Sequence, residues 1–243
     1  MVKRYKMIIS YDGSNFYGYQ KQPSKRTIQG EIEKVLSMIL SEDIKLISAG
    51  RTDKGVHAYY QVGVFDTNKK IDLYKFLYSL NKLLPEDIFI RKISRCKNDF
   101  NPRFNVKYKI YEYYINYKEY NPLKRNYELF YKTFNKEKIE SILPLFIGKK
   151  DFKNFTSKEE DNDLFYRTIY DLKLIKTKSG YKFVFKGNGF MRYEIRKIVG
   201  TILAYNDNKI SIEEIKNYLY KKERDIVPFQ VDSKGLYLKK VIY

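Results

Sequence analysis

Four side chains capable of polar chemistry lie within seven positions of the chain. They are Arg51, Asp53, Lys54 and His57, in the stretch SAGRTDKGVHA (residues 48–58). A guanidinium group favours the charged form of a nearby carboxylate, so we expect Asp53 to be ionised beside Arg51. An ionised carboxylate held among cations can act as a nucleophile, a base or an electrostatic stabiliser.

The same stretch also has the composition of an ordinary turn, because Asp and Gly occupy their usual turn positions in TDKG. Gly50 and Gly55 permit backbone conformations closed to other residues, which suits a plain turn or a loop that projects side chains into a cleft. His57 is the only histidine. It is either an acid or base or a hydrogen-bonded structural group, since the sequence identifies no orienting partner for it.

A second group of candidates lies in KYKIYEYYINY (residues 107–117), whose alternation predicts a long strand. Its tyrosines divide between two faces, Tyr111 and Tyr113 on one and Tyr108 and Tyr114 on the other. Aromatic rings interleaved with Lys107 and Lys109 suit base stacking beside phosphate contacts. Tyrosine also favours strands for purely structural reasons, which explains most of the 25 tyrosines.

A third group lies in FMRYEIRKIVGTILAY (residues 190–205), which has the apolar periodicity of a helix. Arg192 and Arg196 are four residues apart and would share one face of that helix. They can bind phosphate or pair with Asp53. A solvated basic face is the competing interpretation.

The overall charge indicates a polyanionic partner. Lys and Arg number 48 against 29 Asp and Glu, a formal net charge of +19, which favours nucleic acid. A Lys-rich, Tyr-rich composition without Trp is also typical of an AT-rich genome. Cys96 is the only cysteine, which excludes an internal disulfide and a Cys–His zinc site. We see no signal peptide and no run long enough to cross a membrane, and expect a cytoplasmic protein.

The predicted elements follow one order twice: strand, helix, strand, strand, helix, strand. Strands are predicted at residues 5–11, 44–48, 60–66, 88–93, 106–117, 171–176, 181–186 and 236–243. Helices are predicted after Thr27 and Asp72, at 136–147, at 190–205 and after Ser211. This order predicts an α+β protein of two ferredoxin-like, RRM-like halves, with antiparallel sheets and helices on one side. We place the halves at residues 1–98 and 99–243.

Taken together, the motifs resemble the TruA-type tRNA pseudouridine synthases over nearly the whole chain. The segment AGRTDKGVHA (49–58) is very close to the family's catalytic loop. Six further segments fall in matching order: YDGSNFYGYQKQ (11–22), RTIQGEIEKVL (26–36), FNPRFNVKYKIYEYYI (100–115), DFKNFTS (151–157), GNGFMRYEIRKIVGTIL (187–203) and GLYLKKVIY (235–243).

The resemblance implies an isomerase that converts uridine to pseudouridine at one or more of tRNA positions 38, 39 and 40, in the anticodon stem-loop. Asp53 matches the catalytic aspartate, which attacks either the ribose C1′ or the uracil C6. Tyr111 matches a tyrosine that stacks on the uracil and helps remove the C5 proton. Arg196 matches the basic residue that pairs with the aspartate, and Arg51 matches an arginine that displaces or holds the flipped base.

Further expectations come with this family. Lys54, His57, Arg192, Lys107 and Lys109 are expected to contact the substrate RNA. No metal or other cofactor is needed, and the protein is expected to be a homodimer. The two halves are expected to share one extended sheet, with a basic cleft between them that binds the RNA backbone.

Four positions depart from the family pattern. Tyr19 stands where Trp is usual, which changes stacking or packing. Arg192-Tyr193 stands where many relatives carry two histidines. Glu194 stands where an apolar residue is typical, so it either forms a salt bridge or alters packing.

Two other classes of function compete with the enzyme. A non-catalytic RNA-binding module of the same shape would need the basic charge and the aromatics, but not Asp53, Tyr111 and Arg196 together. A carboxylate glycosidase would need a second carboxylate near Asp53, and the sequence identifies none.

Overall fold

The fold was obtained as a computed structural model that describes residues 2–157, 165–221 and 223–243. It has the predicted α+β character, with mostly antiparallel strand pairs. The chain forms two compact units, unit 1 of residues 1–107 and 237–243 and unit 2 of residues 108–236. The sequence prediction divides the chain between residues 98 and 99, whereas unit 1 extends to Lys107 and includes the C-terminal strand.

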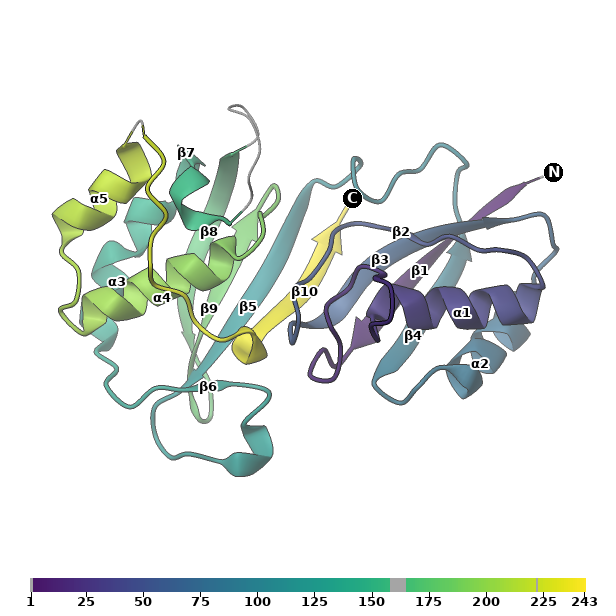
Figure 1. Cartoon of the computed structure of the whole chain (residues 1–243), viewed down its shortest axis with the longest axis horizontal. Helices are drawn as coiled ribbons and strands as arrows, with labels where there is room; N and C mark the ends of the chain where they lie inside the picture. Colours follow the sequence, from purple (N-terminus) through teal and green to yellow (C-terminus); the bar gives the residue numbers. More distant parts are fainter. Residues whose placement is uncertain (1, 158–164, 222) are drawn as a thin grey trace. The chain divides into compact units, whose positions relative to one another are not determined.

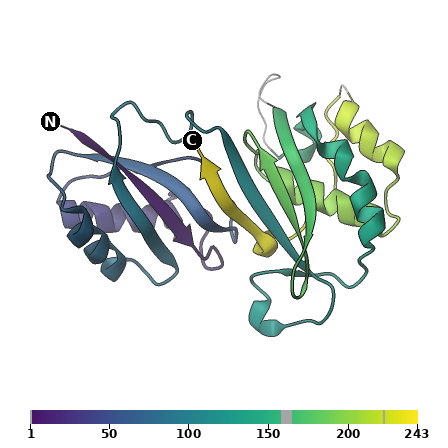
Figure 2. The ribbon, with the colours of Figure 1, turned by 180° about the vertical axis from the view of Figure 1, so that it is seen from behind.

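Unit 1 is a sheet in the order β4–β1–β3–β10, with a short strand β2 paired to β3. The strands are β1 (Lys3–Tyr11), β2 (Ile47–Ser48), β3 (His57–Thr67), β4 (Ile88–Arg95) and β10 (Leu236–Ile242). Strand β10 runs parallel to β3, and the other pairs are antiparallel. Helices α1 (Ile28–Leu40) and α2 (Leu73–Leu83) lie on one face of the sheet, as Figures 1 and 2 show. Their apolar sides bury Met7, Leu36 and Leu80 completely.

The helix starts of unit 1 follow the sequence signals. The Thr27 side chain accepts the Gly30 N–H, and the Asp72 carboxylate accepts the N–H groups of Tyr74 and Lys75 in the first turn of α2. Each cap satisfies backbone donors that a helix start leaves unpaired. The predicted N-caps at Thr27 and Asp72 are therefore confirmed.

Unit 2 is an antiparallel sheet in the order β5–β9–β8–β7. Its strands are β5 (Tyr108–Asn116), β7 (Gly148–Asp151), β8 (Tyr166–Lys176) and β9 (Gly180–Gly187), with a short β6 (Leu129–Phe130) parallel to β5. Helices α3 (Lys136–Ile142), α4 (Glu194–Asn206) and α5 (Ile212–Tyr220) lie on one face of this sheet (Figure 1). Phe183, Ile198 and Ile202 are fully buried between the layers. Over the described ranges, no helix is both long and apolar enough to cross a membrane.

Several element boundaries differ from the prediction. The strand predicted at 44–48 keeps only Ile47–Ser48, and the helix predicted at 136–147 ends at Ile142 and continues as a 3-10 turn, Leu143–Phe146. Pro144 has no N–H and cannot continue the α-helical ladder. Strand β7, with the sequence GKKD, was not predicted, because its two lysines and its aspartate carry no strand signal.

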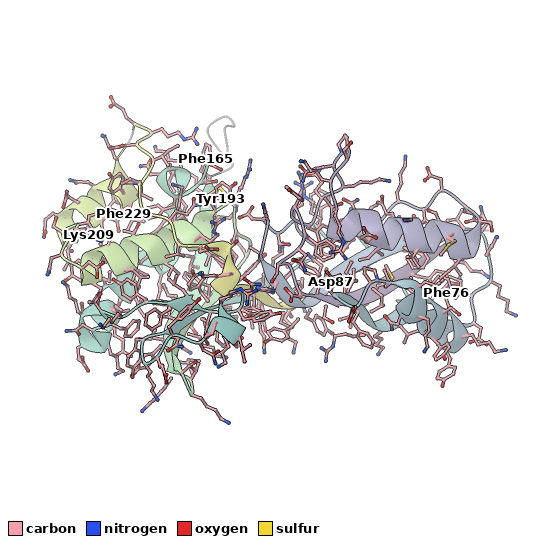
Figure 3. The ribbon with its side chains drawn as sticks, turned by 60° about the horizontal axis from the view of Figure 1, so that its bottom comes forward. Phe76, Asp87, Phe165, Tyr193, Lys209 and Phe229 are labelled. Carbon is pink, nitrogen blue, oxygen red and sulfur yellow. The ribbon has the colours of Figure 1, made fainter. Side chains whose placement is uncertain are left out.

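The helix predicted at 190–205 begins four residues later than expected, at Glu194. Tyr193 precedes it in the left-handed region, with φ +64°, a conformation that residues with a Cβ rarely adopt. Tyr193 is labelled in Figure 3. Glu194 is completely buried, and its Oε2 accepts the Met191 N–H at 2.7 Å. This bond closes the turn before α4, so the unusual glutamate serves the backbone of that turn.

Burial raises the pKa of Glu194 from 4.5 to about 8, even though the Met191 N–H opposes the shift. The folded protein therefore keeps a proton that the unfolded chain releases as the pH rises. The stability that depends on this proton is complete below about pH 4.5 and is lost as the pH rises to about 8.

We predict that Glu194→Gln, which cannot ionise, gains stability relative to the wild type as the pH rises from 5 to 9. The expected gain in the free energy of unfolding is about 2 kcal/mol or more, since one pKa unit corresponds to ~1.4 kcal/mol. Urea unfolding at several pH values measures it, with the exposed Glu213→Gln as the matched control. A stability difference that stays constant with pH contradicts the prediction.

Candidate active site

Asp53 lies on the loop of residues 49–56, which joins the paired strands β2 and β3. The Val56 N–H donates to the Asp53 carbonyl at 3.2 Å, and Gly55 between them has φ +77°. A glycine with positive φ at this position is the mark of a tight turn. Asp53 therefore opens a turn, as its local sequence indicates, and its side chain is half-buried. Being a turn residue and carrying a functional carboxylate are compatible.

Thr52, next to Asp53, anchors the loop. It is 8% exposed, its Oγ1 lies 2.8 Å from the Tyr11 hydroxyl, and its carbonyl accepts the Tyr19 N–H at 3.0 Å. The amide of the fully buried Gln61 donates to the Gly50 carbonyl at 2.9 Å. Burial raises the pKa of the Tyr11 hydroxyl, so Tyr11 stays neutral in its hydrogen bond with Thr52. The loop backbone is thus held on the N-terminal side of Asp53 by buried polar groups.

Segment 11–20, the first signature of the chain, lies directly against this loop. A Cβ on Gly13 would lie 2.1 Å from the Val56 carbonyl oxygen, and one on Gly18 (φ +94°) would lie 3.1 Å from the Thr52 oxygen. Glycine is required at both positions because two backbones pack together there. Tyr19, in the place of Trp, is 2% exposed and hydrogen-bonds to the Ser48 hydroxyl. The Tyr19 departure therefore concerns packing under the loop.

His57 is buried at the end of the loop, with 2% of its surface exposed. Its Nδ1 accepts the Gly13 N–H at 3.1 Å and lies 3.1 Å from an Asp12 oxygen. Its ring stacks on Tyr237 with 4.6 Å between centroids. These contacts favour the structural interpretation of His57, as a link between segment 11–20, β3 and β10.

The two basic residues of the loop, Arg51 and Lys54, are exposed. Arg51 donates to the Gln20 side-chain oxygen at 2.6 Å. The Lys54 ammonium lies 4.5 Å from the centre of the Tyr17 ring.

Tyr111 belongs to unit 2, on the face of β5 that also carries the fully buried Tyr113. It is 8% exposed and meets Phe190 edge-on, with 5.3 Å between ring centres. Tyr108 and Tyr114 are half-exposed on the opposite face, under the ammonium groups of Lys186 and Lys182, so the predicted division of tyrosines is confirmed. Lys109 lies in β5, and the exposed Lys107 ends unit 1.

Arg196 lies in the first turn of α4 and is held by the segment that precedes β10. Its Nε donates to the Val231 carbonyl at 2.9 Å, and the Val231 N–H donates to the Arg196 carbonyl. A Cβ on Gly200 would lie 2.7 Å from the Gln230 nitrogen, so this segment packs closely on the helix. The Nε–H group of Arg196 is therefore bound within unit 2.

Arg192 does not lie on the same helix face as Arg196, because α4 has not yet begun at residue 192. The left-handed turn at Tyr193 nevertheless places both guanidinium groups near one ring, at 4.7 and 5.1 Å from its centre. Arg192 also donates to the Tyr193 hydroxyl at 2.9 Å. The two arginines are thus brought together by Tyr193.

The residues that support the loop were not predicted individually from the sequence; they are Tyr11, Gly13, Gly18, Thr52 and Gln61. A polar residue at a buried position of an apolar strand was the available signal for Gln61. Nothing local marked Thr52, because threonine is ordinary in a loop. Among the described residues there is no group of three His, Cys, Asp or Glu side chains able to hold a metal ion.

Comparisons with known proteins show the family to which the chain belongs. A family model described as tRNA pseudouridine synthase matches residues 7–105 and 142–243. The chain is 37% identical to tRNA pseudouridine synthase A of Lactococcus lactis subsp. cremoris (strain MG1363), over 99% of this chain and 97% of that protein. It is 39% identical to the protein of the same name from Streptococcus agalactiae serotype Ia, over 99% and 95%, and 37% identical to that of Onion yellows phytoplasma, over 98% of each. The chain therefore belongs to the tRNA pseudouridine synthase family.

Proposed function

We propose that this chain converts uridine to pseudouridine at position 38, 39 or 40 of tRNA, or at several of them, with Asp53 as the nucleophile. The supporting observation is the loop: a half-buried carboxylate in AGRTDKGVHA, beside an anchored Thr52, between two exposed cations. A fixed backbone lets a nucleophile meet its target without a further ordering cost.

The reaction conserves all the atoms of the nucleotide. The bond between N1 and C1′ breaks, the uracil turns, and a bond between C5 and C1′ forms. C5 loses a proton and N1 gains one. Asp53 attacks either C1′ or C6 and leaves again when the new bond has formed. A base inside a stacked stem is out of reach, so the uridine must first be flipped out.

Three other side chains are assigned roles in the same reaction. Tyr111 stacks on the uracil and helps remove the C5 proton. Arg196 pairs with the Asp53 carboxylate through its terminal nitrogens, which keeps that carboxylate charged. Arg51 displaces or holds the flipped base.

The remaining assignments concern the RNA and the assembly. Lys54, Arg192, Lys107 and Lys109 bind the RNA backbone in the anticodon stem-loop, and His57 supports the loop that meets it. We further propose a homodimer in the cytoplasm, in which one tRNA contacts both subunits. The reaction as written needs no redox or group-transfer cofactor, because it neither oxidises nor adds an atom.

We predict that Asp53→Asn abolishes pseudouridine formation, by at least ~1000-fold, while tRNA binding stays within about threefold of the wild type. The amide keeps the size of the side chain but is no nucleophile. Pseudouridine mapping of an unmodified tRNA transcript measures the product at each position, and filter binding measures affinity.

Asp43→Asn, at an exposed site after α1, is the matched control and should retain full activity. Product formed by the Asp53→Asn variant would refute the assignment of Asp53 as the nucleophile. Wild-type protein that binds tRNA without forming product would identify a non-catalytic RNA-binding module, and product outside positions 38–40 would refute the assigned positions.

We predict that Tyr111→Phe lowers turnover by about 100-fold, the scale of one general acid or base, and leaves tRNA affinity unchanged. Phenylalanine keeps the stacking ring and removes only the hydroxyl. Tritium release from a transcript labelled at uracil C5 follows the proton directly. Tyr108→Phe, on the opposite face of the same strand, is the control, and wild-type tritium release by Tyr111→Phe would exclude the hydroxyl from the proton transfer.

A further inference from the structure

Tyr17 is the one aromatic residue of segment 11–20 that faces solvent. Its side chain is 47% exposed, whereas Tyr11, Phe16 and Tyr19 are 5% exposed or less. The buried rings fill the space under the Asp53 loop. The exposed Tyr17 ring contributes little to that core, so core packing does not explain why a tyrosine occupies this position.

The backbone of Tyr17 is firmly held. Its N–H donates to the Arg26 carbonyl at 2.9 Å, and its carbonyl accepts the Gln22 side-chain amide at 3.0 Å. Arg26 in turn makes two hydrogen bonds of 2.8 Å to Asp87, labelled in Figure 3, and covers the Phe16 ring at 4.1 Å. The exposed ring therefore projects from a rigid base.

This ring also adjoins the Asp53 loop. Gly18 follows Tyr17. A Cβ on Gly18 would lie 3.3 Å from the backbone nitrogen of Lys54 and 3.4 Å from the carbonyl carbon of Asp53. The backbone of Gly18, next to Tyr17, is thus in contact with the backbone of Asp53 and Lys54 within unit 1.

Two ammonium groups gather on the ring. Lys25 Nζ lies 4.6 Å and Lys54 Nζ 4.5 Å from its centre. Neither lysine pairs with a carboxylate of the described residues, whereas the neighbouring Arg26 is neutralised by Asp87 and Glu31. Two like charges without a counter-charge repel each other, and the attraction of an exposed ring for each is weak. A phosphodiester would relieve this repulsion.

We propose that Tyr17, Lys25 and Lys54 form a nucleotide-binding platform beside the nucleophile loop. Phosphates draw the two ammonium groups away from the ring, and the uncovered ring face stacks on an unpaired base next to the target uridine. The platform holds the strand from which the target is flipped. Its assignment to tRNA rests on the proposed function, and the net charge of +19 favours RNA over an acidic protein as the occupant.

The test measures affinity in the Asp53→Asn background, so that turnover does not disturb it. The probe is an unmodified tRNA transcript, titrated at several salt concentrations. Tyr17→Ala should weaken binding by about 5- to 100-fold, and Tyr17→Phe should bind within twofold of the background, because stacking needs the ring and not the hydroxyl. The salt slope is the slope of the logarithm of the binding constant against the logarithm of the salt concentration. Replacing Lys25 and Lys54 together by Gln should reduce its magnitude by about two, one for each phosphate contact.

Tyr78 and Lys82 of α2 provide the matched control in the same unit. Tyr78 is 61% exposed, with the Lys82 ammonium 5.6 Å from its ring centre. Tyr78→Ala and Lys82→Gln should each leave the affinity within twofold, and thermal unfolding should show that all variants remain folded. The platform is refuted if Tyr17→Ala binds as the background does, if Tyr78→Ala weakens binding equally, or if the salt slope stays unchanged in the double lysine variant.

The failure of the platform is separable from the failure of the proposed function. If the wild type forms no pseudouridine but the Tyr17 variants lose affinity, the chemistry is refuted and the platform stands. If product forms and the Tyr17 variants bind normally, the chemistry stands and the platform is refuted. An Asp53→Asn protein that does not bind tRNA refutes both.

Discussion

The position of Asp53 depends on the hydrogen bonds that its neighbour Thr52 makes below the loop. Thr52 is bound through its side chain to Tyr11 and through its carbonyl to the Tyr19 backbone. Neither bond would form if segment 11–20 lay further away, and the bare backbones of Gly13 and Gly18 allow the close approach. One buried threonine thus connects segment 11–20 to the loop that carries Asp53.

Polar groups under a loop are a costly way to support it, because each must find a partner once water is excluded. Tyr11, Thr52 and Gln61 meet this condition by bonding to the loop or to each other. An apolar core would also have stabilised the fold. Apolar contacts are not directional, however, so they would not have fixed the position of the loop backbone as hydrogen bonds do. Directed bonds hold a catalytic group in place before the substrate arrives, which lowers the ordering cost of the reaction.

The sequence predicts the helices and most strands, because these follow from periodicity and caps. The members of the candidate site come from the family resemblance, and their roles stay predictions. The sequence does not predict where α4 begins, since the pattern of apolar residues runs unbroken through Met191 while the left-handed Tyr193 stops the helix. Neither does it reveal that Arg51 turns to Gln20, because that partner lies 31 residues earlier. Local patterns carry local structure, whereas these contacts depend on tertiary packing.

The same limit applies to charge. A net charge of +19 indicates a polyanionic partner, but it does not say which cations meet it. Arg4 and Arg26 are closely paired with Asp66 and Asp87, and their charges support the fold. Lys25 and Lys54 pair with no carboxylate among the residues that the structure describes, so they keep their attraction for phosphate. The cations available to bind phosphate therefore depend on where the folded chain places its carboxylates. The number of lysines in the sequence does not give those positions.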